Sequence, residues 1–141
     1  EKLNMSKDEV IERREKRKQD YLFLHENWSS VIPDKISHII IDGNNMRGGG
    51  PKRLSRNDVI KIAENTSKID TICYFDGSLT KVIDNNLDIR FSMDKIADDT
   101  IIEFIESSPK CKYLVITCDR GLAIRVLRLG SHVMRNKTYI K

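Results

Sequence analysis

The sequence predicts an α/β domain in three layers, with a parallel sheet covered by helices on both faces. From Ile36 onward, short apolar runs typical of buried strands alternate with longer stretches that have helical periodicity. Five strand-like and four helix-like segments follow one another, and three of the strand segments end in aspartate. Strands that alternate with helices form parallel sheets joined by crossover helices. The 141 residues are enough for one such core.

An N-terminal helical extension, residues 1–35, precedes this domain, which we assign to residues 36–141. Residues 5–28 are expected to form a charged helix, and Pro33 punctuates its end. Its apolar anchors are few: Val10, Ile11, Tyr21, Leu22, Leu24 and Trp28. We therefore expect a helix that docks on the core or on a partner.

The first half of the domain is expected to contain three strands and two helices. The strands are residues 37–42, 70–77 and 88–92. A helix over residues 54–65 has Ser55 as its N-cap and Asp58 in its first turn. Residues 79–86 are expected to form a short helix between the second and third strands.

The second half is expected to contain two helices and two strands. The helix over residues 95–107 places Ile96, Ile101, Ile102 and Ile105 toward the sheet, and residues 112–119 form the fourth strand. A helix over residues 120–130 ends at Gly130, and residues 131–135 form the last strand.

The charge distribution points to a polyanionic partner. The formal net charge is +4 and the pI is near 9.0. Residues 1–35 carry eight basic and eight acidic side chains, so the surplus lies in residues 36–141, with seventeen against thirteen. A basic surplus on the globular domain suggests nucleic acid.

The apolar runs and the cysteines bear on the compartment. No apolar run approaches the ~18 residues of a membrane span, so we expect no membrane partner. No secretory-signal pattern follows Glu1. Cys73, Cys111 and Cys118 form no metal-binding or disulfide pattern. Cys73 and Cys118 lie in apolar runs, where we expect them to be small hydrophobic residues of the core. We expect an intracellular protein, either cytoplasmic or organellar.

Carboxylates gather where the ligand site of a parallel sheet is expected. Such sites lie beyond the carboxyl ends of the strands, where the strand order reverses. The first, second and fourth strands end in Asp42, Asp76 and Asp119. With a strand order of 3-2-1-4-5, Asp42 lies beside Asp119, and Asp76 is next along. Asp98, in the first turn of the preceding helix, points over the same edge.

Carboxylates that converge in this way need either raised pKa values or a cation. Oxygen ligands without cysteine or histidine favour Mg²⁺ or Mn²⁺. Such an ion can activate a water molecule and neutralise a transferring phosphoryl group. The site is therefore suited to metal-dependent attack on a phosphodiester.

Simpler interpretations of these residues remain open. Each aspartate can be a helix N-cap or a turn residue. Asn44 and Asn45 can be turn residues, or Asn45 can hydrogen-bond across the cluster and fix Asp42. Arg120 can pair with Asp119, bind phosphate or lie in solvent. The glycine-rich loop 47–53 can be inconsequential, or it can reshape around a substrate with Arg47, Lys52 and Arg53 supplying charge.

Other nucleotide-binding and catalytic motifs are absent. The glycines after the first strand lack the lysine and Ser/Thr of a Walker A loop, and no GxGxxG pattern or nucleophile elbow occurs.

Four motifs resemble those of a known nuclease family. The stretches "IIIDGNN", "YFDGS", "KIADDTI" and "VITCDRGL" occur in the order and approximate spacing of the NYN branch of the PIN-like nuclease superfamily, and are most similar to its YacP-type members. The resemblance covers residues 37–135. It implies a Rossmann-like PIN/NYN fold with sheet order 3-2-1-4-5 and ribonuclease activity that depends on Mg²⁺ or Mn²⁺.

The resemblance also implies roles for individual residues. Asp42 matches the metal-binding aspartate of the first strand, and Asn45 matches the asparagine of the D-G-x-N motif. Asp98 and Asp99 match the A-D-D pair, while Asp119 matches the aspartate that follows Thr or Ser after strand four. Asp76 has no secure counterpart, and the triple-glycine loop is longer and more basic than the family pattern.

We therefore predict a metal-dependent ribonuclease, an endoribonuclease rather than an exonuclease. Asp42, Asp98 and Asp119 hold the ion, Asp99 is an outer-sphere ligand or water-orienting base, and Asn45 and Asp76 support the site. The predicted substrate is single-stranded RNA, whose phosphates are held by Arg47, Lys52, Arg53 and Arg120.

Two alternatives remain open. The chain can be an inactive RNA- or protein-binding subunit of a ribonucleoprotein complex, docked through its N-terminal helix. A phosphotransferase or phosphatase is less favoured, because its second acid is missing at Asn44.

Overall fold

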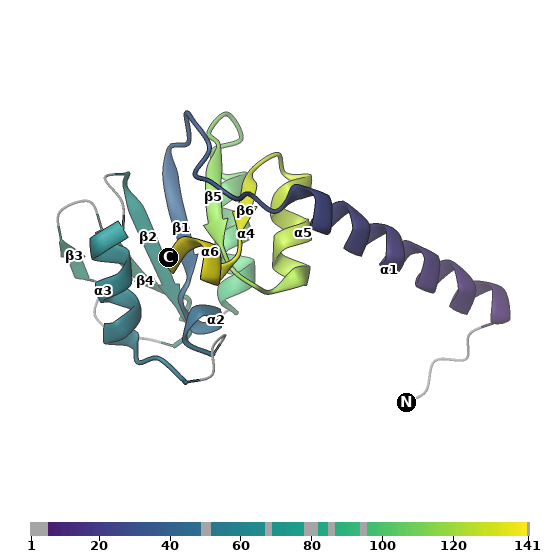
Figure 1. Ribbon diagram of the computed structural model, residues 1–141, viewed down its shortest axis with the longest axis horizontal. Helices are drawn as coiled ribbons and strands as arrows, with labels where there is room; N and C mark the ends of the chain where they lie inside the picture. Colours follow the sequence, from purple (N-terminus) through teal and green to yellow (C-terminus); the bar gives the residue numbers. More distant parts are fainter. Residues whose placement is uncertain are drawn as a thin grey trace.

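A twisted sheet of six strands, five of them parallel, forms the centre of the molecule (Figure 1). This computed structural model describes residues 6–48, 52–66, 69–77, 82–84, 87–93 and 96–140. The strand order is β3-β4-β2-β1-β5-β6. The strands are β1 (His38–Asp42), β2 (Thr71–Phe75), β3 (Val82–Asp84), β4 (Leu87–Phe91), β5 (Tyr113–Ile116) and β6 (His132–Met134).

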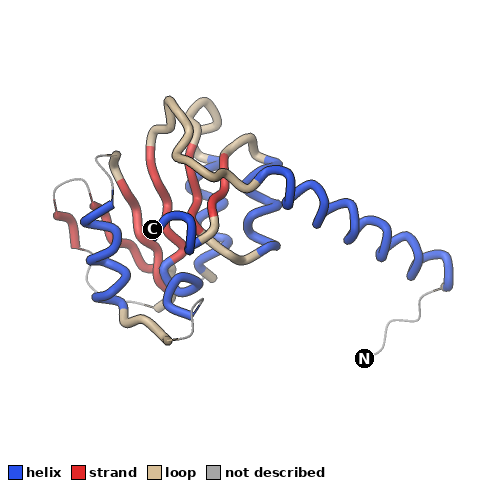
Figure 2. The backbone as a smooth tube through the Cα atoms, viewed as in Figure 1, coloured by secondary structure: helices blue, strands red, loops and turns tan. Residues whose placement is uncertain are grey.

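Helices cover both faces of this sheet (Figure 2). They are α1 (Lys7–Asn27), α2 (Gly43–Gly48), α3 (Arg56–Thr66), α4 (Ala97–Glu106), α5 (Arg120–Arg128) and α6 (Asn136–Ile140). On one face, α4, α5 and the end of α1 pack on alternate strand residues such as Ile40 and Val115. On the other face, α2, α3 and α6 pack on Ile39 and Ile41. This is the three-layer α/β arrangement that the sequence predicts.

The strand register places the carboxyl ends of β1, β2 and β5 at one edge. β1 pairs in parallel with both neighbours, so that Ile41 lies opposite Cys73 on one side and Ile116 on the other. The chain runs from β1 outward to β2 and β4, and then returns to the other side of β1 for β5 and β6. The five parallel strands thus have the predicted order 3-2-1-4-5, with the reversal between β1 and β5.

Local signals in the sequence explain where several helices begin and end. Ser55 and Asp58 form a reciprocal cap at the start of α3, in which each backbone N–H donates to the other side chain at 3.0 Å. Gly130 follows α5 with φ = 87°, the left-handed conformation that commonly ends a helix. Both predicted helix ends are confirmed.

Three elements and one residue differ from prediction. Val82–Asp84 is an antiparallel edge strand, so the short helix predicted over residues 79–86 is wrong there; the rest of that segment lies outside the described residues. The short helices α2 and α6 were not predicted. Ile96 does not face the core: it precedes α4 as the N-cap residue and is 63% exposed.

Further expectations concern the first residues of two predicted helices, the glycine-rich loop and the cysteines in apolar runs. Met5 and Lys95, the predicted first residues of two helices, and Gly49–Pro51 of the loop lie outside the described residues. Cys73 is buried in the core as expected, and burial raises the pKa of its thiol to about 12. Cys118 is exposed, because it lies beyond the end of β5, so the expectation that it is a core residue is wrong. Within the described part of the chain, no helix has the length and apolar character needed to cross a membrane.

Candidate metal and phosphodiester site

The candidate site begins where β1 passes directly into α2. Asp42 is the last residue of β1, and Gly43 opens the helix. A Cβ on Gly43 would lie 2.5 Å from the Phe75 ring and 2.7 Å from the Tyr74 carbonyl oxygen. Glycine is therefore required here because the turn packs directly on the end of β2.

Asp42 is a buried carboxyl group held by hydrogen bonds. Its side chain is 3% exposed, and its Oδ2 accepts a hydrogen bond from Thr117 Oγ1 at 2.9 Å. The backbone N–H of Asn45 also donates to it. Burial raises the pKa of Asp42 to about 6, because the hydrogen bonds offset the desolvation of the charged form only in part. The negative charges of Asp119 and Asp76 raise the pKa further.

Thr117 connects Asp42 to Asp119 across the strand reversal. Its hydroxyl is fully buried, donates to Asp42, and accepts from the backbone N–H of Asp119 at 3.0 Å. Asp119 is the N-cap of α5, since its Oδ1 accepts from the N–H of Leu122 at 3.1 Å. The N-cap interpretation and the site interpretation of Asp119 are therefore compatible.

Asp98, in the first turn of α4, completes a charge-coupled group with Asp42 and Asp119. Its side chain is half-buried and shares a hydrogen bond with the side chain of Asp119. Burial raises the pKa of Asp98 to about 7, and the negative charges of Asp119 and Asp42 add to the effect. The structure thus brings together the three aspartates predicted to hold an ion.

Asp76 has a positioning role at the same edge. Its Oδ1 accepts hydrogen bonds from the backbone N–H of Ala97 at 3.0 Å and from the Ser92 hydroxyl at 3.4 Å. Ala97 is the first residue of α4, so Asp76 anchors the helix that carries Asp98.

Asn45 ties together the ends of β1, β5 and β6. Its Oδ1 accepts from the backbone N–H of Cys118 at 2.7 Å and from Asn136 Nδ2 at 3.0 Å. This supports the interpretation in which Asn45 hydrogen-bonds across the cluster. Asn136 is itself 4% exposed, and its Oδ1 is buried with no hydrogen-bond donor within reach among the described residues.

Asp99, the neighbour of Asp98, has a different partner. It forms an ion pair with Arg125 of α5, with Nη1 and Oδ1 3.1 Å apart. Both side chains are about half exposed. The structure therefore separates the two acids of the A-D-D pair: Asp98 joins Asp42 and Asp119, whereas Asp99 is bound to a cation.

The predicted phosphate-binding residues lie in two places. Arg47 donates from Nε to the carbonyl oxygen of Leu54 at 3.0 Å and closes the loop between α2 and α3, on which Lys52 and Arg53 are exposed. Arg120 directly follows Asp119, and its guanidinium lies 5.1 Å from the centre of the Tyr21 ring on α1. The two groups therefore belong to different elements, and their described contacts are with Leu54 and Tyr21 and not with the aspartates.

The carboxylate oxygens of Asp42, Asp98 and Asp119 are of the kind that bind a hard divalent cation, but the three groups are not arranged as a complete set of ligands. Carboxylate oxygens are the ligands that Mg²⁺ and Mn²⁺ prefer. Among the residues that the structure describes, no group of three or more His, Cys, Asp and Glu side chains is already arranged to hold a metal ion. Mg²⁺ commonly binds through one or two carboxylates together with water and substrate phosphate. The Asp98–Asp119 pair with Asp42 beside it fits that mode of binding.

Sequence reasoning did not identify Thr117 and Asn136 as site residues. Thr117 ends the apolar run of β5, and a polar residue at that point signals a group needed at the carboxyl edge of the sheet. Asn136 lies two residues after the end of β6 and is the first residue of α6. The rule that selected the aspartates missed both residues, because the predicted fourth strand ran past Thr117 to residue 119 and the predicted last strand ended before Asn136.

Comparison of the chain with protein-family models, with curated proteins and with solved structures finds no match. The resemblance to the NYN branch therefore stands on the four sequence motifs.

Proposed function

We propose that this protein is a ribonuclease that hydrolyses phosphodiester bonds in single-stranded RNA with the help of Mg²⁺ or Mn²⁺. The observation that supports the proposal most directly is the convergence of Asp42, Asp98 and Asp119 at the strand reversal of a parallel sheet. The Thr117 hydroxyl links Asp42 to the backbone of Asp119, and Asp98 shares a hydrogen bond with the Asp119 side chain. Two raised carboxyl pKa values at such an edge are typical of a functional site. We favour cleavage at internal phosphodiester bonds of the RNA over removal of nucleotides from its ends.

Asp42, Asp98 and Asp119 would hold the ion. A bound divalent cation would neutralise the negative charge of the phosphoryl group and lower the pKa of a water molecule. Binding would require Asp98 and Asp42 to lose their protons, since metal ligands must be deprotonated. Asp99 would influence the site from outside the ligand shell, because its carboxylate is paired with Arg125.

The surrounding residues would keep these carboxylates in place. Thr117 orients Asp42 and the backbone of Asp119, and Asp76 anchors the helix of Asp98. Water would attack phosphorus, the bond to the 3′ oxygen would break, and that oxygen would take up a proton. The products would be a 5′-phosphate and a 3′-hydroxyl. Arg47, Lys52, Arg53 and Arg120 would bind flanking phosphates.

RNA cleavage in the presence of Mn²⁺ tests this proposal. Wild type is compared with Asp119→Asn, because asparagine is also a good N-cap and should preserve the start of α5. The exposed Asp34→Asn is the control for loss of one negative charge. We expect Asp119→Asn to lose at least about a hundredfold in rate, roughly 2.7 kcal/mol of transition-state stabilisation. Equal rates for wild type and Asp119→Asn would overturn the proposal.

The lack of a complete set of metal ligands among the described residues supports a second candidate function. Without a ready-made set of three ligands among the described residues, the same fold can serve as a binding subunit for RNA or protein. That function predicts tight RNA binding in EDTA and no cleavage with either Mg²⁺ or Mn²⁺.

We also propose an intracellular location, in the cytoplasm or an organelle. Cys73, Cys111 and Cys118 are all free thiols, which supports a reducing compartment.

A further inference from the structure

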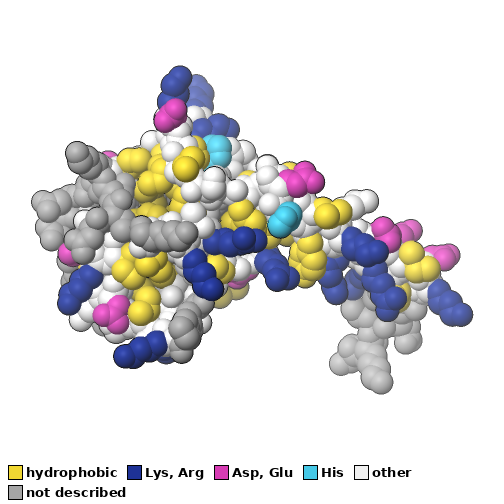
Figure 3. Space-filling model, viewed as in Figure 1, with side chains coloured by type: hydrophobic (Ala, Val, Ile, Leu, Met, Phe, Trp, Pro, Cys, Tyr) yellow, Lys and Arg dark blue, Asp and Glu magenta, His cyan; other side chains and the backbone are white. Residues whose placement is uncertain are grey.

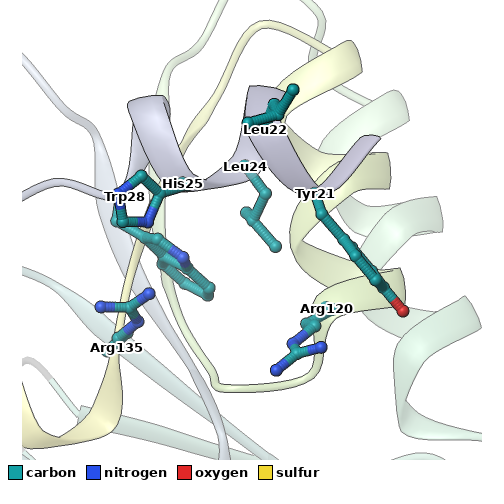
Figure 4. Close-up of a pocket in the computed structure, with 7 residues that line it drawn as sticks. All are labelled: Tyr21, Leu22, Leu24, His25, Trp28, Arg120 and Arg135. Carbon is teal, nitrogen blue, oxygen red and sulfur yellow. The ribbon is translucent and has the colours of Figure 1, made fainter. Parts of the chain in front are cut away.

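A pair of adjoining hollows runs along the seam between α1 and the body of the molecule. One, of about 320 Å³, is lined by residues that include Tyr21, Trp28, Arg120 and Arg135 (Figure 4). The other, of about 370 Å³, continues toward the N-terminus of α1 and shares Tyr21 and Arg120 with the first. The two hollows meet at Tyr21 and Arg120, and we call them together the α1 groove.

The α1 groove is cationic. Its lining contains Arg13, Lys16, Arg17, Arg120 and Arg135. Asp20, a carboxylate in its described lining, is paired with Arg128, with 2.6 Å between Oδ1 and Nη2. The three cations from α1 lie one helical turn or less apart and share a face. Lys and Arg side chains gather along α1 and at its junction with the body on the face shown in Figure 3.

Aromatic rings alternate with these cations. The guanidinium of Arg120 lies 5.1 Å from the centre of the Tyr21 ring, and that of Arg135 lies 4.9 Å from the centre of the Trp28 ring. Figure 4 shows Tyr21 and Trp28 projecting from α1 toward the two arginines. Tyr21 is 45% exposed, so part of its surface is open to a ligand. Cationic grooves with accessible aromatic side chains are typical of surfaces that bind single-stranded nucleic acid.

The α1 groove adjoins the acidic site through Arg120. Arg120, which lines both hollows, is the residue directly after Asp119 and the first residue of α5. From Arg13 to Trp28 the helix spans about 22 Å, long enough for several nucleotides. A strand held in the groove would therefore pass Arg120, the chain neighbour of Asp119.

We propose that the α1 groove binds the sugar-phosphate backbone of single-stranded RNA and guides it to Asp42, Asp98 and Asp119. This inference uses the proposed function for its substrate and gives the N-terminal helix a role in holding that substrate. Arg13, Lys16, Arg17 and Arg120 contact phosphates, and Tyr21 offers a ring on which a base stacks.

Binding of a labelled oligouridine, measured by fluorescence anisotropy in EDTA, tests the groove without cleavage. Arg13→Ala/Arg17→Ala removes two charges that line the groove. Arg14→Ala/Lys18→Ala removes two charges from the same exposed helix at positions that line neither hollow. We expect the first pair to weaken binding about tenfold and to reduce the salt slope by about 1.4, since each phosphate contact on a single strand contributes ~0.7. The control pair should weaken binding less than about threefold.

Three outcomes would overturn the proposal. The first is equal weakening by both pairs, which would show an effect of net charge alone. The second is unchanged binding in the groove pair, with circular dichroism confirming that both variants retain α1. The third is equally strong competition by polyglutamate, which would indicate a surface for acidic protein.

Failure of the groove and failure of the nuclease proposal give different results. If the protein cleaves RNA with Mn²⁺ and Arg13→Ala/Arg17→Ala has an unchanged KM, the groove proposal is wrong and the nuclease proposal is supported. If Arg13→Ala/Arg17→Ala binds RNA more weakly than wild type and wild type does not cleave RNA, the groove proposal is supported and the nuclease proposal is wrong.

Discussion

At the residue scale, the fold opposes ionisation of Asp42 and Asp98. Both carboxyl groups have a reference pKa of 3.8, and burial raises these values to about 6 and about 7. A folded-state pKa above the unfolded value means that the folded protein binds the proton more tightly. The resulting stabilisation is complete below pH 3.8 and is lost as the pH rises through about 6 for Asp42 and about 7 for Asp98.

The variant Asp98→Asn should therefore stabilise the protein in a pH-dependent way. Asparagine resembles the protonated carboxyl group and can still donate to Asp119. We expect a melting temperature higher by about 3 °C near pH 8 and little changed near pH 4, where Asp98 is neutral. Thermal unfolding followed by circular dichroism at both pH values measures this. A lower melting temperature near pH 8, or the same gain at both pH values, would contradict the assigned charge coupling.

The hydroxyl of Thr117 gives a second prediction at this scale. Thr117→Val keeps the shape but leaves Asp42 Oδ2 and the N–H of Asp119 without this partner. We expect the free energy of unfolding to fall by about 1–3 kcal/mol, because buried polar groups lose their hydrogen bonds. Chemical denaturation measures the loss. Thr117→Ser, which retains the hydroxyl, should recover RNA cleavage that Thr117→Val lacks; equal cleavage by both would remove Thr117 from the site.

At the element scale, the passage from β1 to α2 depends on one close approach. Gly43→Ala would push a methyl group against the Tyr74 carbonyl and the Phe75 ring. We expect a loss of about 1–3 kcal/mol or more in the free energy of unfolding, as in other overpacked sites, together with weaker cleavage. Gly48→Ala, at the far end of the same helix, meets no atom within 4 Å and should change stability by less than about 0.5 kcal/mol. Similar effects of both substitutions in chemical denaturation would refute the packing argument.

Most elements could be predicted because their signals are local. The capping pair Ser55 and Asp58 and the terminal Gly130 act within a few residues of the helices that they delimit. The strand β3 was not predicted, because residues 79–86 were interpreted as a short helix. The pattern also fits a hairpin, because Val82 and Ile83 are adjacent β-branched residues and an Asn-Asn pair follows Asp84. In the structure Asp84 pairs with Leu87.

At the scale of the whole molecule, topology places the site. Parallel strands that end at one edge bring Asp42 next to Asp119, and α4 adds Asp98. That juxtaposition could be predicted because it needs only the strand order and the strand ends. The pairing of Asp99 with Arg125 and the link through Thr117 could not, since both depend on side-chain rotamers. The α1 groove depends on where α1 docks, which its sparse apolar anchors did not specify.

The central claim is that Asp42, Asp98 and Asp119 form one divalent-cation site, and titration calorimetry with Mn²⁺ near pH 7 tests it most directly. Asp98→Asn and Asp99→Asn remove the same charge from adjacent residues, but only Asp98 is hydrogen-bonded to Asp119 in the described structure. We predict that wild type binds Mn²⁺, that Asp98→Asn binds at least about tenfold more weakly, or ~1.4 kcal/mol, and that Asp99→Asn changes affinity less than about threefold. No binding to wild type at millimolar Mn²⁺, or equal losses in the two variants, would contradict the claim.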